Sequence, residues 1–214
     1  MIDIEERAAR AMGLFRDGYN CCQSVALAFS DVLDEHTGMT PEQIAAVTGG
    51  FGGGLARLRE VCGCVSGLAF VAGALRPSPP VPGGHGSSFA TAPEPAQGYP
   101  APVQGCHNHA SGPEPASAPA PAPGPEPAPA SAPASSPMEA KKACYALVQE
   151  LAESFRRENG AVVCRELLGL RFGRKDPPQP SERTGAYYKA RPCERLVGSA
   201  ARILAEKLEE IKIK

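Results

Sequence analysis

One stretch near the middle of the chain decides the fold class. Residues 138–155 read MEAKKACYALVQELAESF, and Asn159-Gly160 follows as a helix stop signal. The apolar side chains recur every three or four residues, which is the period of an α-helix with one buried face. The stripe consists of Ala140, Cys144, Leu147, Val148, Leu151 and Phe155.

Other parts of the chain repeat this helical period. Thr40-Pro41-Glu42-Gln43 forms a capping box with proline at the first helical position, and it predicts a short helix that stops at Gly49-Gly50. A second short helix is expected over 161–168, and the proline-rich residues 170–191 are expected to form a loop. Longer amphipathic helices are predicted over 3–17, 21–34, 61–75 and 192–211.

No segment alternates with period two for long, so strands are not expected. We therefore predict an all-α fold, a compact helical bundle of about six or seven helices. The bundle is interrupted where residues 77–137 hold 18 of the 23 prolines and almost nothing apolar larger than alanine. Such a segment cannot bury enough apolar surface to offset its ordering entropy. We predict a disordered Pro/Ala-rich insertion over 77–137 and a single helical domain formed by 1–76 and 138–214.

Charge and hydropathy restrict the partners and the compartment. Lys and Arg number 22 against 23 Asp and Glu, so the chain lacks the basic excess of a nucleic-acid binder. The first residues are charged and lack a secretory signal, and the apolar run at 61–75 is too short to span a bilayer. We expect a cytoplasmic protein that binds no membrane. Its eight cysteines then point to metal, cluster or redox chemistry before structural disulfides.

The cysteines gather near the starts of predicted helices. No CxxC spacing occurs, which excludes thioredoxin-like dithiols, zinc ribbons and c-type haem attachment. Thiols one or two residues apart on a helix point in different directions, so each close pair should send one thiol inward. A single cysteine is most often a small buried apolar residue, but a helix start also stabilises a thiolate. The eight are Cys21, Cys22, Cys62, Cys64, Cys106, Cys144, Cys164 and Cys193.

Four blocks around these cysteines resemble one family. Gly18-Tyr-Asn-Cys21-Cys-Gln-Ser-Val, the glycine run 49–54 with Val61-Cys62-Gly-Cys-Val-Ser-Gly67, Cys164-Arg-Glu-Leu-Leu-Gly169 and Cys193-Glu-Arg-Leu-Val197 occur in that order. They are similar to the motifs of the C_GCAxxG_C_C family of small redox-active proteins, across residues 1–76 and 138–210. The resemblance implies four hallmark cysteines that are redox-active or bind a cofactor or metal. These carry over to Cys21, Cys62, Cys164 and Cys193.

Two departures from the family motifs add thiols. Cys22 and Cys64 stand where the family usually has alanine. Either residue could extend a cluster of sulfurs as an auxiliary thiol. The favoured interpretation is replacement of alanine by cysteine in a niche for small residues.

The four hallmark cysteines are compatible with two kinds of redox chemistry. Four thiolates can ligate an iron–sulfur cluster, or pairs of thiols can carry electrons by disulfide exchange. A zinc site is third, because all-cysteine zinc sites usually use closely paired ligands. Arg57, Arg59 and Arg165 flank hallmark cysteines and would favour thiolates. We expect an electron carrier with a redox partner protein, more than a stand-alone enzyme. A non-catalytic metal-binding or sensing module is the alternative.

Two further signals lie outside the hallmark blocks. His85, Cys106, His107 and His109 fall within the insertion and could bind copper, nickel or zinc, although a flexible segment is poorly preorganised for this. Tyr187-Tyr188-Lys189 could fold over the thiol site, but an ordinary surface loop is the favoured interpretation.

Overall fold

The prediction of an all-α fold is confirmed by a computed structural model that describes residues 2–76, 136–171 and 176–213. These residues belong to one compact unit, and their one extended pairing is an isolated bridge between Val61 and Val163. Most of the expected insertion, residues 77–135, lies outside the described part of the chain. The elements are α1 (Ile4–Arg16), α2 (Cys21–Leu27), α3 (Ser30–Thr37), α4 (Pro41–Thr48), the 3₁₀ turn η1 (Gly49–Phe51), α5 (Gly63–Leu75), α6 (Pro137–Asn159), α7 (Cys164–Leu167), α8 (Gly185–Ala190) and α9 (Cys193–Glu210).

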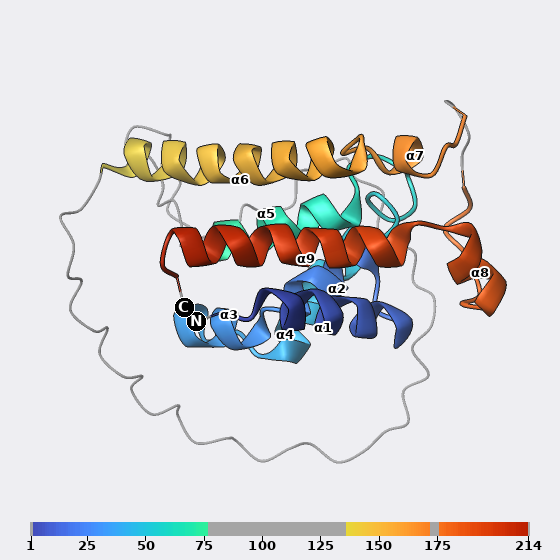
Figure 1. Ribbon diagram of the computed structural model, residues 1–214, viewed down its shortest axis with the longest axis horizontal. Helices are drawn as coiled ribbons and strands as arrows, with labels where there is room; N and C mark the ends of the chain where they lie inside the picture. Colours follow the sequence, from blue (N-terminus) through green and yellow to red (C-terminus); the bar gives the residue numbers. More distant parts are fainter. Residues whose placement is uncertain (1, 77–135, 172–175, 214) are drawn as a thin grey trace, which may run out of the picture. The chain divides into compact units, whose positions relative to one another are not determined.

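Helix α9 is the central element of the core. It packs most extensively against α1 and also contacts α6, α2 and α5, and Figure 1 shows it running between α6 and α1. Every residue from Leu196 to Ala201 is buried, which is more than one helix face. A helix that is covered on several sides must lie inside its neighbours. The apolar residues of the other helices therefore converge on α9.

The stretch 21–34, predicted as one helix, divides at Ala28 and Phe29 into α2 and α3. The Phe29 N–H bonds the carbonyl of Ala26 at 3.1 Å, a tightened turn, and its ψ of 24° lies outside the helical range. Arg7 of α1 donates to the Ala28 carbonyl at 2.6 Å and to Asp31 of α3. The guanidinium of Arg7 thus binds a backbone carbonyl at the point where the helix breaks. The helical spacing of residues 21–34 alone could not predict this contact.

At the proline-rich segments one helix was not predicted and another begins slightly earlier than predicted. Residues 185–190, expected within a loop, form α8, whose cap Thr184 accepts a hydrogen bond from the Tyr187 N–H. Helix α6 begins at Pro137, where Ser136 and Glu139 form a capping box. The Ser136-Pro137-Met138-Glu139 capping signal thus starts α6 at the edge of the predicted insertion.

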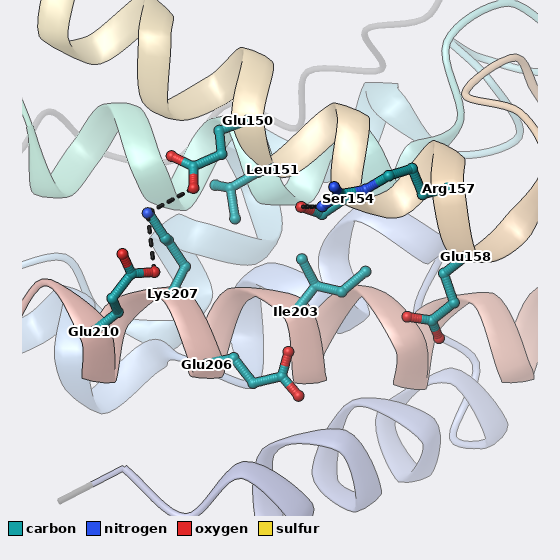
Figure 2. A pocket seen from close by; sticks show the side chains of 9 residues that line it. All are labelled: Glu150, Leu151, Ser154, Arg157, Glu158, Ile203, Glu206, Lys207 and Glu210. Carbon is teal, nitrogen blue, oxygen red and sulfur yellow. Dashed lines mark hydrogen bonds and ion pairs between the residues drawn. The ribbon is translucent and has the colours of Figure 1, made fainter.

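A groove between α6 and α9 is bordered by charged side chains from both helices. Lys207 donates to Glu150 of α6 at 2.7 Å and to Glu210 at 3.0 Å (Figure 2). These contacts tie the two helices together near the C-terminal half of α9. Because the carboxylates are largely exposed, we expect each pair to contribute less than about 1 kcal/mol.

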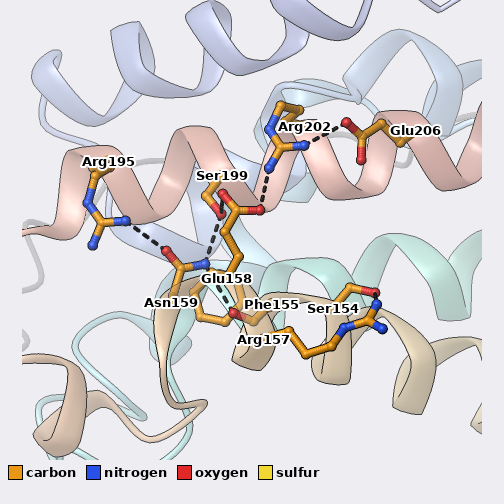
Figure 3. A network of polar contacts seen from close by, with 9 residues as sticks. All are labelled: Ser154, Phe155, Arg157, Glu158, Asn159, Arg195, Ser199, Arg202 and Glu206. Atoms are coloured by element: carbon orange, nitrogen blue, oxygen red, sulfur yellow. Dashed lines mark hydrogen bonds and ion pairs between the residues drawn. The ribbon is translucent and has the colours of Figure 1, made fainter.

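A polar network fixes the other end of the α6–α9 contact. The Asn159 amide donates to the Ser199 hydroxyl at 2.8 Å and accepts from Arg195 at 3.0 Å (Figure 3). Ser199 in turn donates to Glu158, which also pairs with Arg202. The network holds the end of α6 against the first half of α9. The chain that leaves α6 is thereby directed toward Cys164 and the start of α9.

Helix α5 approaches α2 closely because small residues face the contact. A Cβ added at Gly67 would lie 2.8 Å from the Cβ of Val25 and 3.1 Å from the Cys22 carbonyl oxygen. The same addition at Gly73 meets nothing within 4 Å. Only part of the small-residue pattern therefore serves close packing. No helix in the described part of the chain is long and apolar enough to cross a membrane.

These two glycines give a matched test of the α2–α5 contact. Gly67→Ala should lower the free energy of unfolding by about 1–3 kcal/mol, because overpacking outweighs the better helix propensity. Gly73→Ala should raise it by up to about 1 kcal/mol. Urea denaturation followed by circular dichroism measures both. Equal stabilisation by the two substitutions would contradict the close approach.

Candidate functional site

The four hallmark cysteines lie around one small cavity. Cys21 begins α2, Cys164 begins α7, Cys193 begins α9, and Cys62 is the residue that caps α5. All four line a space of about 50 Å³, and Cys64 lines it as well. We call this five-cysteine cavity the thiol pocket. Four helix starts thus meet at sulfur, each with first-turn N–H groups that lack helical partners.

Backbone pairing brings two of these cysteines side by side. The Cys62 N–H donates to the Val162 carbonyl at 2.8 Å, and the Cys164 N–H donates to the Glu60 carbonyl at 2.6 Å. These bonds flank the antiparallel bridge between Val61 and Val163. The bridge joins residues about one hundred positions apart in sequence. It fixes the spacing of Cys62 and Cys164 independently of side-chain packing.

Two glycines allow the cysteine-bearing segments to meet. A Cβ at Gly54 would lie 2.6 Å from the Cβ of Cys164, and a Cβ at Gly63 would lie 3.0 Å from the Cβ of Cys21. Gly54 also has a φ of 72°, which side chains rarely adopt. Any larger residue would push the cysteines apart. The glycine run therefore serves the geometry of the thiol pocket.

The loop after Gly54 has an unusual backbone. Leu55, Ala56, Arg57 and Arg59 all have φ between 44° and 69°, the left-handed region. This conformation costs roughly 1–2 kcal/mol for each residue with a side chain. The loop is held by buried Arg59, whose Nε donates to Asp176 at 2.7 Å. Its shape carries the Arg59 guanidinium to a hydrogen bond with Cys164.

Within the pocket, Cys21 is the thiol most easily ionised. Hydrogen bonds from the thiols of Cys193 and Cys64 lower the pKa of Cys21 well below its usual value, and the charge of Arg183 adds to this. The backbone N–H of Cys21 itself also favours the thiolate, while burial opposes it. A sulfur that receives two S–H donors is stabilised as an anion. Cys21 is therefore the thiol of the pocket that loses its proton most readily.

The surrounding thiols are held in the protonated form. The hydrogen bond to Cys21 is the main cause of the raised pKa of both Cys64 and Cys193, and burial adds to it. Burial is the main cause that raises the pKa of Cys164 to about 11, and the hydrogen bond and charge of Arg59 oppose this rise without cancelling it. In the metal-free protein one thiolate is thus surrounded by thiol donors.

The cysteines beside the hallmark positions behave differently from each other. Cys22 is fully buried but does not line the pocket, and burial raises its pKa to about 12. Cys62 and Cys64 both line it, whereas one inward thiol was expected from each close pair. Cys62 lies outside the helix with a ψ of 133°, so the rotation of about 100° per residue does not apply between these two.

Side chains from the 176–191 segment form one wall of the pocket. Arg183, Tyr187 and Arg191 line it, and Arg183 donates to the carbonyls of Phe15 at 2.8 Å and Tyr19 at 3.0 Å. The interpretation of Tyr187 as part of an ordinary surface loop was wrong. The three prolines of this segment predict a loop. Nothing in the local sequence indicates the long-range contacts that its arginines make. Neighbouring Tyr188 packs edge-on against Phe15.

Of the three arginines expected near the thiols, Arg59 lines the thiol pocket. Arg59 contacts Cys164, whereas Arg57 donates to the Pro177 carbonyl and the Ser181 hydroxyl, both at 3.0 Å. Arg165 pairs with Glu60. Adjacency in sequence therefore did not identify the cations of the pocket.

The remaining cysteines and histidines lie elsewhere. Cys144 is half-buried on α6 and does not line the thiol pocket. The second metal site expected from His85, Cys106, His107 and His109 lies outside the described residues. In the described part of the chain, no three His, Cys, Asp or Glu side chains are placed to hold a single metal ion.

Fold and pocket together define a helical protein with a buried multi-thiol site. Residues 19–98 and 128–207 match the family described as "Putative redox-active protein (C_GCAxxG_C_C)". The match spans most of the chain, so the chain belongs to this family, and the resemblance seen in its motifs is confirmed. Searches of curated proteins and of solved structures found no significant match.

The order of thiol reactivity tests the electrostatics of the pocket. In the reduced, metal-free protein, iodoacetamide at pH 7 should modify Cys21 well before Cys22, Cys164 or Cys193, because only the thiolate reacts. A thiol with a pKa of about 12 is ionised at pH 7 in about one molecule in 10⁵. Peptide mass mapping across pH 5–10 gives each rate.

A matched pair of variants separates the cause. Cys64→Ala removes a donor to Cys21, so the pKa of Cys21 should rise and its rate at pH 7 should fall. Cys22→Ala removes a buried thiol that makes no such bond, and it should leave the rate within about twofold. A wild-type Cys21 that titrates near an ordinary thiol would contradict this description.

Proposed function

We propose that this protein carries electrons through an iron–sulfur cluster or another metal centre held by Cys21, Cys62, Cys164 and Cys193. The observation that carries the proposal is the convergence of these four thiols, from four separate helix starts, on one cavity. Such a cluster requires four cysteine thiolates and a shielding shell. Its chemistry when bound is the reversible uptake of single electrons.

The arrangement of the four hallmark thiols fits a cluster better than a single metal ion. A tetrahedral zinc site needs all its sulfurs about 2.3 Å from one point, and the described residues contain no group of three such donors. A cluster spreads its irons, so each iron needs only one or two protein thiolates. The cavity of about 50 Å³ understates the room, because metal–sulfur bonds are shorter than the non-bonded contacts that define its walls.

The charges around the pocket support an anionic centre. Arg59, Arg183 and Arg191 line it, and each of the four hallmark sulfurs stands at a helix start. Hydrogen bonds and positive charge near thiolates stabilise a negative cluster and raise its reduction potential. The carboxylate of Asp176 is bound to Arg59 and adds one negative charge near these arginines. We infer that these residues set the potential.

Burial of the sulfurs also favours electron transfer over exchange at the surface. Cys62, Cys164 and Cys193 are each less than one-tenth exposed, and Cys64 is fully buried. Electrons reach such a site without direct contact, whereas disulfide exchange requires a sulfur to be attacked. The proposal therefore includes a redox partner protein that docks over the pocket. The compartment that we propose is the cytoplasm.

A metal-free dithiol function is the second candidate, and the hydrogen bonds of Cys21 favour it. The Cys21 thiolate would attack a disulfide of a partner protein and release one partner thiolate, which takes up a proton. Cys193 or Cys64, both hydrogen-bonded to Cys21, would then attack the mixed disulfide. That step releases the reduced partner and leaves a disulfide within the pocket, so two electrons have passed to the partner.

Anaerobic purification distinguishes the two candidates. The wild-type chain should be coloured, with iron and acid-labile sulfide bound. Serine at Cys21, Cys62, Cys164 or Cys193 should each remove most of the iron and the visible absorption, since each removes one ligand. Cys144→Ser, on α6 outside the pocket, should retain both. A colourless, iron-free protein after anaerobic reconstitution, with a disulfide mapped to Cys21, would favour the dithiol function instead.

A further inference from the structure

A second cavity opens directly beside the thiol pocket. It has a volume of about 470 Å³ and is bordered by the glycine-rich segment 49–53, the loop around Arg57 and the 178–191 segment. Asn20, Arg59, Arg183, Tyr187 and Arg191 line both cavities. Its volume is in the range of small-molecule sites. We call it the arginine groove, after Arg57, Arg59, Arg183 and Arg191.

The charge of the arginine groove is strongly one-sided. Four guanidinium groups line it, and among the residues that the structure describes no carboxylate does. Asp176 is not among the lining residues. Its carboxylate is bound to Arg59 and lies 3.8 Å from the guanidinium of Arg57, and its single charge can neutralise only one of the two. The groove between α6 and α9 is of similar size, yet four glutamates face two cations there (Figure 2). Size alone does not distinguish the two cavities, but the sign of the charge does.

The arginines are held in place largely by neutral acceptors. Arg183 donates to two backbone carbonyls and stacks on the ring of Phe15 at 4.6 Å. Arg57 donates to the Pro177 carbonyl and the Ser181 hydroxyl. These bonds to neutral acceptors hold Arg183 and Arg57 in position without bringing further negative charge to them. The groove is thus preorganised for negative charge.

Arg191 has the largest unused donor capacity of the four. It lies 4.9 Å from the ring centroid of Tyr187 and makes no hydrogen bond or ion pair within the described part of the chain. A half-buried guanidinium has five N–H donors in a planar fork that matches carboxylate and phosphate oxygens. The residue is therefore placed to take a ligand at the boundary between the two cavities.

We propose that the arginine groove binds a small anion bearing phosphate or carboxylate groups, next to the thiol pocket. The ligand spans the groove between Arg57 and Arg191, with Arg183 at the wall. Its negative charge compensates the surplus of guanidinium groups. Binding needs no metal in the thiol pocket, so this proposal does not depend on the cluster.

Isothermal titration of the full chain with inorganic pyrophosphate or with citrate, at constant ionic strength, tests the groove. We expect one site per chain for at least one of the two probes. Arg191→Gln should weaken that binding by tenfold or more, because charge-assisted hydrogen bonds to the oxyanion are lost. Arg191→Lys, which keeps the charge but not the planar fork, should give an intermediate loss.

Lys189→Gln is the matched control. Lys189 is exposed on α8, two residues from Arg191, and does not line the groove. Its substitution by glutamine removes the same charge as Arg191→Gln. It should change the affinity by less than about twofold, because an exposed charge is screened. The proposal is overturned if neither probe binds, or if Lys189→Gln and Arg191→Gln weaken binding equally. Circular dichroism of each variant shows that the fold is retained, and Arg191→Lys decides the matter if Arg191→Gln unfolds.

Discussion

The contact of glycine against cysteine is the constraint on which the rest of the structure depends. Four helix starts can place their sulfurs around one cavity only if the backbones beside them come unusually close. Gly54 against Cys164 and Gly63 against Cys21 provide that approach. The bridge between Val61 and Val163 then fixes the spacing of the two cysteines that flank it.

The strained loop 55–59 follows from the same constraint. Its left-handed residues are unfavourable alone, and such backbone persists only when surrounding contacts hold it. Here the contacts are the Arg59–Asp176 pair and the backbone bonds to 162–165. The loop turns Arg59 toward Cys164 and Arg57 toward the neighbouring groove. The strained backbone of this loop thus places positively charged side chains beside both cavities.

The sequence predicted the helices well where the signals are local. Capping boxes and the helical period located α1, α4, the body of α6 and α9, and motif order identified the family. The prediction failed where a distant residue decides the local structure. Arg7 binds the Ala28 carbonyl and separates α2 from α3, and the extended Cys62 lets both thiols of its pair face one cavity. Arg183 and Arg191 line the pocket, although the prolines of their segment predict only a surface loop.

Placement of the hallmark cysteines was likewise beyond local reasoning. Spacing gave four candidates on different helices, but only the packing around α9 shows that they share one cavity, and that Cys64 joins them while Cys22 does not. The proposed function requires the four hallmark thiolates to hold one metal centre together. Iron K-edge X-ray absorption of the anaerobically purified protein tests this most directly. We expect an all-sulfur first shell with a second iron nearby, whereas nitrogen or oxygen ligands, or the absence of iron, would contradict the proposed centre.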